Sequence, residues 1–273
     1  MFVTRLISGI VLVAAALLTI TLNGPVLYFT LLVLSLIGMF ELYRATGIRR
    51  EKDNALTLTA YAGATVYYIV MYAGLSDFYL IALTGALTAL LFVYVFTYPT
   101  YDATQVMTAY FGIIYVAVCL SYIFQTRNLP DGRWEVWLIF ICAWGCDTLA
   151  YCAGRLFGKH KMAPALSPKK TIEGAVGGVA GAAVLGGIYA ACVGRFLVGT
   201  GNKIVIYSLI CAVGALISMA GDLAASAIKR NHGVKDYGKL IPGHGGVMDR
   251  FDSVIFTAPI TFMLAVLLLG DLK

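Results

Sequence analysis

Long apolar runs separated by short polar segments dominate this chain of 273 residues. A helix that spans a membrane needs about 20 mainly apolar residues. Nine runs approach that length, and they cover residues 6–22, 26–42, 55–74, 78–97, 105–125, 134–153, 172–197, 203–227 and 250–269. The pattern predicts an all-α polytopic membrane protein with about nine transmembrane helices.

Three local patterns refine this prediction. The tripeptide Asn23-Gly24-Pro25 favours a tight turn, so the first two spans are expected to form a helical hairpin. The N-terminus resembles a signal peptide but lacks a small-x-small cleavage site before a soluble body, and we interpret it as the first span. Glycines at three- and four-residue spacing in 172–197 let neighbouring helices approach closely, which predicts a central helix.

Composition supports the membrane class. Hydrophobic residues make up 60% of the chain and charged residues only 12%, whereas soluble domains carry about 25% charged residues. The longest polar stretch, near 228–252, is too short for a separate soluble domain. We therefore expect one integrated membrane domain, with an N-terminal helical region at 1–130 and a catalytic region at 131–273. All six cysteines fall in apolar stretches and are interpreted as small core residues.

Charge predicts the orientation. If the N-terminus is cytoplasmic, fifteen of the twenty Lys and Arg residues fall on the cytoplasmic side. The loops 154–171 and 228–249 then face the cytoplasm, where soluble nucleotides and Mg²⁺ are found. The net charge of +6 fits this asymmetry and anionic headgroups better than a nucleic-acid partner. The expected location is the cell (inner) membrane.

Residues 226–252 depart most from the apolar background, because basic residues, glycines and carboxylates crowd between two spans. Membrane proteins keep ionisable groups at this depth when a task needs them. Lysine and arginine hold phosphates, carboxylates hold divalent metals, and glycines let backbone N–H groups approach a polyphosphate. The mixture predicts a site for a metal and phosphates.

Asp222 lies near the end of the eighth span, and Ser218 and Ser226 share its helix face. A carboxylate there should be neutralised by a metal or a basic group, and a structural ion pair is the alternative. Asp249 and Asp252 share a face at the start of the last span, where helix capping is the alternative. We expect Asp222 and Asp249 to be the main metal ligands, because Mg²⁺ usually takes one or two carboxylates.

A second polar cluster extends from Asp147 to Glu173. Asp147 and Tyr151 are four residues apart on the sixth span, and a Pro-Lys-Lys-Thr turn is expected to open the seventh helix, with Thr171 as its cap. Lipid-headgroup attraction is the alternative to a phosphate site.

The run from Gly233 to Lys239 is similar to a Walker A loop. It lacks the Ser or Thr that binds Mg²⁺ and follows no strand, so we reject a Walker A loop here.

These motifs resemble the signature of the phosphatidate cytidylyltransferases (CDP-diacylglycerol synthases). The resemblance covers roughly residues 140–255 and rests on two strings. One reads Ser226-x-x-Lys-Arg, Lys235-Asp, Pro242-Gly-His-Gly-Gly and Asp249-Arg-x-Asp. The other reads Ser167-Pro-Lys-Lys-Thr-x-Glu-Gly, after Asp147-x-x-Ala-Tyr. Ala225 stands immediately before Ser226, where the family commonly has Glu. This chain therefore lacks the carboxylate that the family has at that position.

The resemblance implies a Mg²⁺-dependent enzyme, with one or two metal ions, that makes CDP-diacylglycerol and pyrophosphate from CTP and phosphatidate as a homodimer in the bilayer. The residues expected to be catalytic are Asp222, Asp249, Lys229, Arg230, Lys235, Asp236 and Arg250. Those expected to bind substrate phosphates are Ser167, Lys169, Lys170, Thr171, Ser226, His244, Gly245 and Gly246. The expected metal ligands are Asp222 and Asp249, followed by Asp252 and Asp147. Alternatives are another lipid acceptor such as an isoprenoid and, more remotely, an ion-coupled transporter.

Overall fold

The computed structural model describes residues 2–48, 54–198, 201–241, 243 and 245–270, and the side chains of residues 2–8 are not among the described parts. The predicted site residue His244 and its neighbour Pro242 lie outside the described residues. The elements in chain order are α1 (Phe2–Leu22), α2 (Gly24–Ala45), α3 (Ala55–Tyr72), η1 (Ser76–Phe78), α4 (Tyr79–Phe96), α5 (Ala103–Gly112), η2 (Ile113–Val118), α6 (Cys119–Arg127), α7 (Gly132–Phe140), η3 (Ile141–Gly145), α8 (Cys146–Phe157), β1 (Lys161–Ala163), β2 (Ser167–Thr171), α9 (Ile172–Val193), η4 (Gly194–Phe196), α10 (Lys203–Asn231) and α11 (Met248–Leu269).

All nine predicted apolar runs are helical. Eight of the described helical segments are long and apolar enough to cross a membrane, and α1 supplies the ninth helix. Two spans are composites of two α-helices each, because α5, η2 and α6 join into one segment and α7, η3 and α8 into another. The all-α polytopic membrane fold is therefore confirmed, whereas the cytoplasmic N-terminus stays a prediction.

Two local features differ from the sequence expectation. The predicted turn before the seventh helix is wrong, because Ser167–Thr171 is the second strand of an antiparallel β-hairpin with β1. A turn prediction considers only adjacent residues, and the partner strand was not visible in the pattern. Both composite spans also contain π-helical turns, η2 and η3, which no hydrophobic period reveals.

The described residues group into two compact units. The first comprises those of Met1–Ser121 and Val234–Asp249, and the second comprises those of Tyr122–Gly233 and Arg250–Lys273. The chain passes between the units three times, so the polar segment 234–249 belongs with the N-terminal helices. The expected division into 1–130 and 131–273 stays a prediction.

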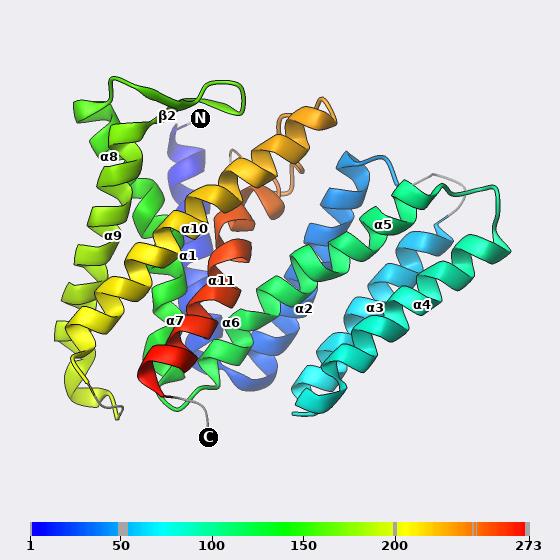
Figure 1. The fold of residues 1–273 in the computed structure, drawn as a ribbon, viewed down its shortest axis with the longest axis horizontal. Helices are drawn as coiled ribbons and strands as arrows, with labels where there is room; N and C mark the ends of the chain where they lie inside the picture. Colours follow the sequence, from blue (N-terminus) through cyan, green and yellow to red (C-terminus); the bar gives the residue numbers. More distant parts are fainter. Residues whose placement is uncertain (1, 49–53, 199–200, 242, 244, 271–273) are drawn as a thin grey trace. The chain divides into compact units, whose positions relative to one another are not determined.

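In the first unit, α3 and α4 lie side by side and α2 packs against α3 (Figure 1). Tyr67 and Tyr68 are fully buried on α3, and each hydroxyl group finds a serine: Ser121 at 3.1 Å and Ser35 at 2.8 Å. A phenol in an apolar core needs a polar partner for its hydroxyl group. The two bonds meet this need, and they join α3 to α6 and to α2.

In the second unit, α9 packs against both α8 and α10 (Figure 1). A methyl group on Gly178 would lie 2.8 Å from the Ala150 Cβ of α8, and one on Gly186 would lie 2.6 Å from the Cys211 Sγ of α10. The glycines therefore allow the close approach that their spacing predicted. Cys142, Cys146 and Cys211 are buried, but the core prediction is wrong for Cys152 and Cys192, whose side chains are exposed.

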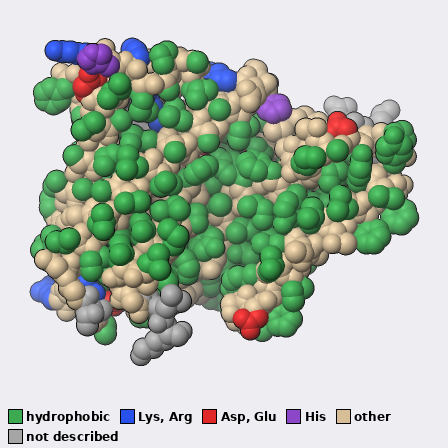
Figure 2. All heavy atoms as spheres, in the orientation of Figure 1, with side chains coloured by type: hydrophobic (Ala, Val, Ile, Leu, Met, Phe, Trp, Pro, Cys, Tyr) green, Lys and Arg blue, Asp and Glu red, His purple; other side chains and the backbone are tan. Residues whose placement is uncertain are grey.

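Many large apolar side chains face outward, as expected for helices that contact lipid. Leu80, Val95 and Phe96 of α4 are 70%, 66% and 81% exposed. Figure 2 shows one face of the molecule covered mostly by hydrophobic side chains, with few charged ones. A multi-pass membrane protein has this surface because bilayer and protein core are similarly apolar.

Candidate functional site

The polar face of α10 carries the first group of predicted site residues. Ser226 Oγ lies 3.5 Å from Asp222 Oδ1 and donates to it, and Ser218 is fully buried one turn before Asp222. The three side chains therefore share one helix face, as their four-residue spacing predicted.

Asp222 forms an ion pair with Lys170 of β2. The two side chains are 25% and 23% exposed, so both charges are largely removed from solvent. The prediction that this carboxylate needs a neutralising partner is confirmed, and the partner is a lysine of the hairpin. Both oxygens of Asp222 are engaged, Oδ2 by Lys170 and Oδ1 by Ser226.

Two further carboxylates of the second unit interact electrostatically with Asp222. They are Asp147 of α8 and Asp252 of α11. Ser253 Oγ donates to Asp147 at 3.4 Å, and the Ser253 N–H donates to Asp252 at 2.8 Å. The positive charge of Lys229 acts on Asp252, and those of Lys170 and Arg250 act on Asp147. Acidic and basic groups are thus interleaved, which lowers the cost of holding three carboxylates together.

A cavity of about 370 Å³ opens beside this group in the second unit. The polar residues that line it are Asp147, Asp222, Lys169, Lys170, Arg155 and Thr171. Tyr151 also lines it, and the Arg155 guanidinium lies 3.5 Å from the Tyr151 hydroxyl group. Three cations and two carboxylates around one cavity suit a ligand that carries phosphates and a divalent cation.

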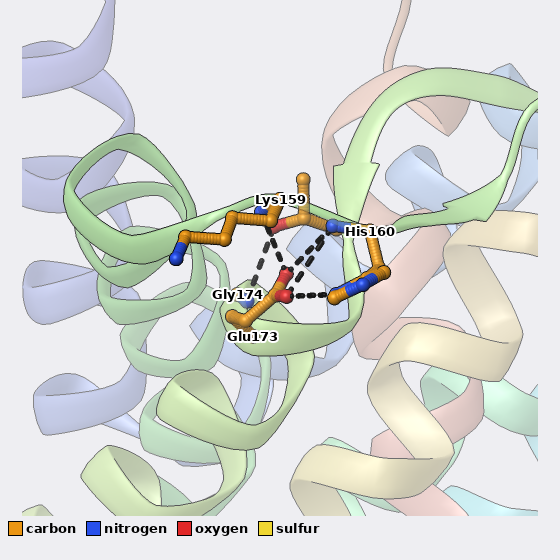
Figure 3. A network of polar contacts seen from close by, with 5 residues as sticks. Lys159, His160, Glu173 and Gly174 are labelled. Carbon is orange, nitrogen blue, oxygen red and sulfur yellow. Dashed lines mark hydrogen bonds and ion pairs between the residues drawn. The ribbon is translucent and has the colours of Figure 1, made fainter.

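Glu173, at the start of α9, fastens the β-hairpin that carries Lys169 and Lys170 (Figure 3). Its carboxylate accepts N–H bonds from Lys159 at 3.0 Å and His160 at 3.2 Å, and it lies 2.6 Å from His160 Nδ1. Glu173 thereby ties the chain just before β1 to the start of α9. The sequence pattern contained Glu173 but did not indicate this role.

Thr171 begins α9 as its N-cap. Its hydroxyl oxygen accepts the Gly174 N–H at 3.1 Å, which confirms the predicted cap. A methyl group on Gly154 or Gly158 of the α8 end would lie 2.9 or 2.8 Å from the same hydroxyl oxygen. The glycines at 154 and 158 therefore let α8 end close to the start of α9.

In the first unit, Asp249 organises the segment 234–249. Its Oδ2 accepts three backbone N–H bonds, from Tyr237 at 2.8 Å, Gly246 at 3.0 Å and Gly238 at 3.4 Å. Asp249 is 6% exposed, whereas Lys235 and Asp236 are exposed. The predicted metal ligand Asp249 is thus, in this structure, a backbone anchor for the segment that carries Gly245 and Gly246.

Two residues of this anchor were missed by the sequence analysis. Glu41 of α2 is 3% exposed and its Oε2 accepts the Met248 N–H at 2.9 Å. Arg44 of α2 donates to the Tyr237 carbonyl oxygen at 2.7 Å. The available signal was Glu41 itself, a lone carboxylate inside the second apolar run. A membrane helix keeps an ionisable group at this depth only where a role requires it.

The predicted residues are thus divided between the units. The second unit holds Asp147, Ser167, Lys169, Lys170, Thr171, Asp222, Ser226, Lys229, Arg230, Arg250 and Asp252. The first holds Lys235, Asp236, Gly245, Gly246 and Asp249. Within the described part of the chain, no three His, Cys, Asp or Glu side chains are grouped closely enough to form a metal site by themselves.

Residues 3–268 match the sequence model of the cytidylyltransferase family. The chain is 31% identical to the phosphatidate cytidylyltransferase of Bacillus subtilis over 273 aligned residues, which cover 96% of this chain and 97% of that protein. It is 30% identical to the Synechocystis phosphatidate cytidylyltransferase, with 98% of each chain covered. The match to the Staphylococcus haemolyticus phosphatidate cytidylyltransferase is 38% identical and spans 57% of each chain.

Proposed function

This chain belongs to the cytidylyltransferase family, and on that premise we propose that it transfers the cytidylyl group of CTP to phosphatidate for phospholipid biosynthesis. An oxygen of the phosphatidate phosphate forms a bond to the α-phosphorus of CTP, and the bond from that phosphorus to the bridging oxygen of the β-phosphate breaks. The products are CDP-diacylglycerol and pyrophosphate. The attacking phosphate is already ionised, so the reaction needs no strong general base.

The observation that carries this proposal is the cavity beside Asp222, lined by Lys169, Lys170 and Arg155. Both substrates are anionic, so charge repulsion and positioning make up much of the barrier. Fixed cations around the cavity would offset the repulsion and orient the phosphates. Lys229, Arg230, Lys235 and Arg250 are proposed to neutralise further phosphate charge, and Asp236 to help order them.

We propose Mg²⁺ as the cofactor, with Asp222 as its principal ligand in the second unit. The chemistry of the nearby side chains supports this proposal, because Asp147 and Asp252 interact electrostatically with Asp222, Ser226 donates to it, and all three carry the hard oxygens that Mg²⁺ prefers. When bound, the ion supplies positive charge that stabilises the phosphates. Asp249 is proposed as a ligand from the sequence pattern, in addition to its contacts with the backbone. Lys170 would turn from Asp222 to a substrate phosphate when the cation binds.

The two substrates differ in where they come from. We propose that phosphatidate keeps its acyl chains in the bilayer and that CTP enters from the cytoplasm, with the basic loops 154–171 and 228–249 on that side of the inner membrane. A homodimer is proposed from the family resemblance. The alternative lipid acceptors are not favoured, because the relatives named above are all phosphatidate cytidylyltransferases.

The test is turnover of labelled CTP by the purified full-length protein in detergent with phosphatidate and Mg²⁺. Metal-dependent formation of CDP-diacylglycerol and pyrophosphate would support the reaction. Asp222→Asn and Asp249→Asn should each abolish it, whereas Asp77→Asn, a change at an exposed residue of η1, should not. CTP binding without product would point to another lipid acceptor, and turnover in both aspartate variants would refute the residue roles.

A further inference from the structure

Glu41 is a buried carboxylate that no motif includes. It lies near the C-terminal end of α2 and is 3% exposed. Burying a carboxylate is costly unless charge-assisted hydrogen bonds replace its hydration. The structure shows which groups meet that need.

The groups around Glu41 come from the backbone of the segment 234–249. Its Oε2 accepts the Met248 N–H at 2.9 Å, and the Val247 N–H also bonds to the carboxylate. Gly238 and Gly246 pack so closely against the carboxylate that a methyl group on either would overlap with it. Glu41 therefore contacts both ends of the segment.

Asp249 binds the same backbone with its own carboxylate. Its Oδ2 takes the N–H groups of Tyr237, Gly238 and Gly246, which bracket the tip of the segment. At the tip, the Ile241 N–H donates to the Gly245 carbonyl oxygen at 2.8 Å. Two buried carboxylates, from α2 and α11, thus hold a loop whose exposed side chains include Lys235 and Asp236.

Arg44 adds a third bond from α2. Its Nη2 donates to the Tyr237 carbonyl oxygen at 2.7 Å, and Tyr237 itself is 1% exposed. One turn of α2 therefore holds two backbone N–H groups and one carbonyl oxygen of the loop. A loop with two glycines against a carboxylate would otherwise sample many conformations.

We propose that Glu41 is a positioning residue for the cytidylyl transfer, which fixes the backbone at Gly238 and at residues 246–248 so that the loop meets the substrate phosphates in one conformation. This assignment rests on the proposed function. Glu41 acts through the loop and contacts no substrate. Its N-terminal location explains why no local motif reveals it.

The test compares Glu41→Gln with Glu135→Gln in the purified full-length protein. Both glutamates are buried in membrane helices, at 3% and 1% exposure, but Glu135 belongs to α7 of the other unit. The glutamine at 41 replaces one acceptor oxygen by an NH₂ group that faces N–H donors. We expect kcat/KM for CTP to fall by about ten- to hundredfold, the fold-change of one charge-assisted bond. Glu135→Gln should change it less than about twofold. Glu41→Asp, which keeps the charge, should recover part of the loss.

Backbone hydrogen exchange supplies a readout that does not depend on turnover. In Glu41→Gln the amides of Tyr237, Gly238, Gly246, Val247 and Met248 should exchange faster, while those of α9 and α10 keep wild-type rates. Equal exchange of this loop in Glu41→Gln and wild type would overturn the proposal. So would a kcat/KM that falls only in proportion to the unfolded fraction. If the wild type makes no CDP-diacylglycerol, the proposed function fails, and the exchange result alone decides whether Glu41 holds the loop.

Discussion

The ion pair between Lys170 and Asp222 allows a quantitative prediction. Lys170→Met removes the ammonium group, keeps much of the apolar stem and leaves the Asp222 carboxylate without its partner. Breaking a fully buried pair costs about 3–5 kcal/mol, whereas an exposed pair contributes about 0–1 kcal/mol. With side chains 23% and 25% exposed, we expect a loss of about 2 kcal/mol, between these limits.

The measurement is the thermal unfolding midpoint in detergent with EDTA and without CTP, because a ligand bound to the folded state would shift the midpoint. A loss of that size corresponds to a midpoint lower by about 4–8 °C. The double variant Lys170→Met/Asp222→Asn should recover most of this, since no unpaired charge remains. Lys169→Met, at the exposed neighbour, should leave the midpoint unchanged.

The same variants separate stability from function. The double variant should fold with nearly wild-type stability and still make no CDP-diacylglycerol, because both charges are proposed to act on the substrates. A single variant as stable as wild type would refute the energetic reasoning. Turnover by the stable double variant would refute the proposed roles of Lys170 and Asp222.

Three other predictions concern the cofactor and the helices around the cavity. EDTA should abolish turnover and added Mg²⁺ should restore it, measured as labelled product; turnover that persists in EDTA would contradict the metal proposal. Thr171→Val should lower stability by about 1 kcal/mol through loss of the α9 cap, whereas Thr171→Ser should not, and equal melting midpoints would contradict the capping role. Gly178→Ala should cost about 1–3 kcal/mol, because the new methyl group would lie 2.8 Å from the Ala150 Cβ, while Gly85→Ala, with no atom within 4 Å, should be neutral or stabilising. Melting midpoints that do not differ between these two glycine variants would contradict the packing argument.

Within the candidate site, local spacing predicted what one helix determines. The face shared by Ser218, Asp222 and Ser226 followed from helix geometry, and the Thr171 cap followed from its place before an apolar run. The partner of Asp222 did not follow, because Lys170 reaches it from a β-hairpin that the local pattern described as a turn.

The anchor of the segment 234–249 shows the same limit over a longer distance. Glu41 and Met248 are separated by 207 positions in the sequence, and their bond exists only because the chain returns to the first unit. The charges and glycines of the sequence identified the loop. They did not predict that the carboxylates of Glu41 and Asp249 bind its backbone. The pattern of polar residues also predicted Asp249 to be a metal ligand, whereas in the structure its Oδ2 accepts backbone N–H groups.

The sequence by itself determined the membrane class, the nine helices and the residues that carry charge near the proposed site, because hydrophobic run length and helical period are local properties. The tertiary structure decided which charges neutralise one another and which carboxylates hold backbone. Those choices depend on distances between elements far apart in the chain, and burial makes each such contact energetically significant.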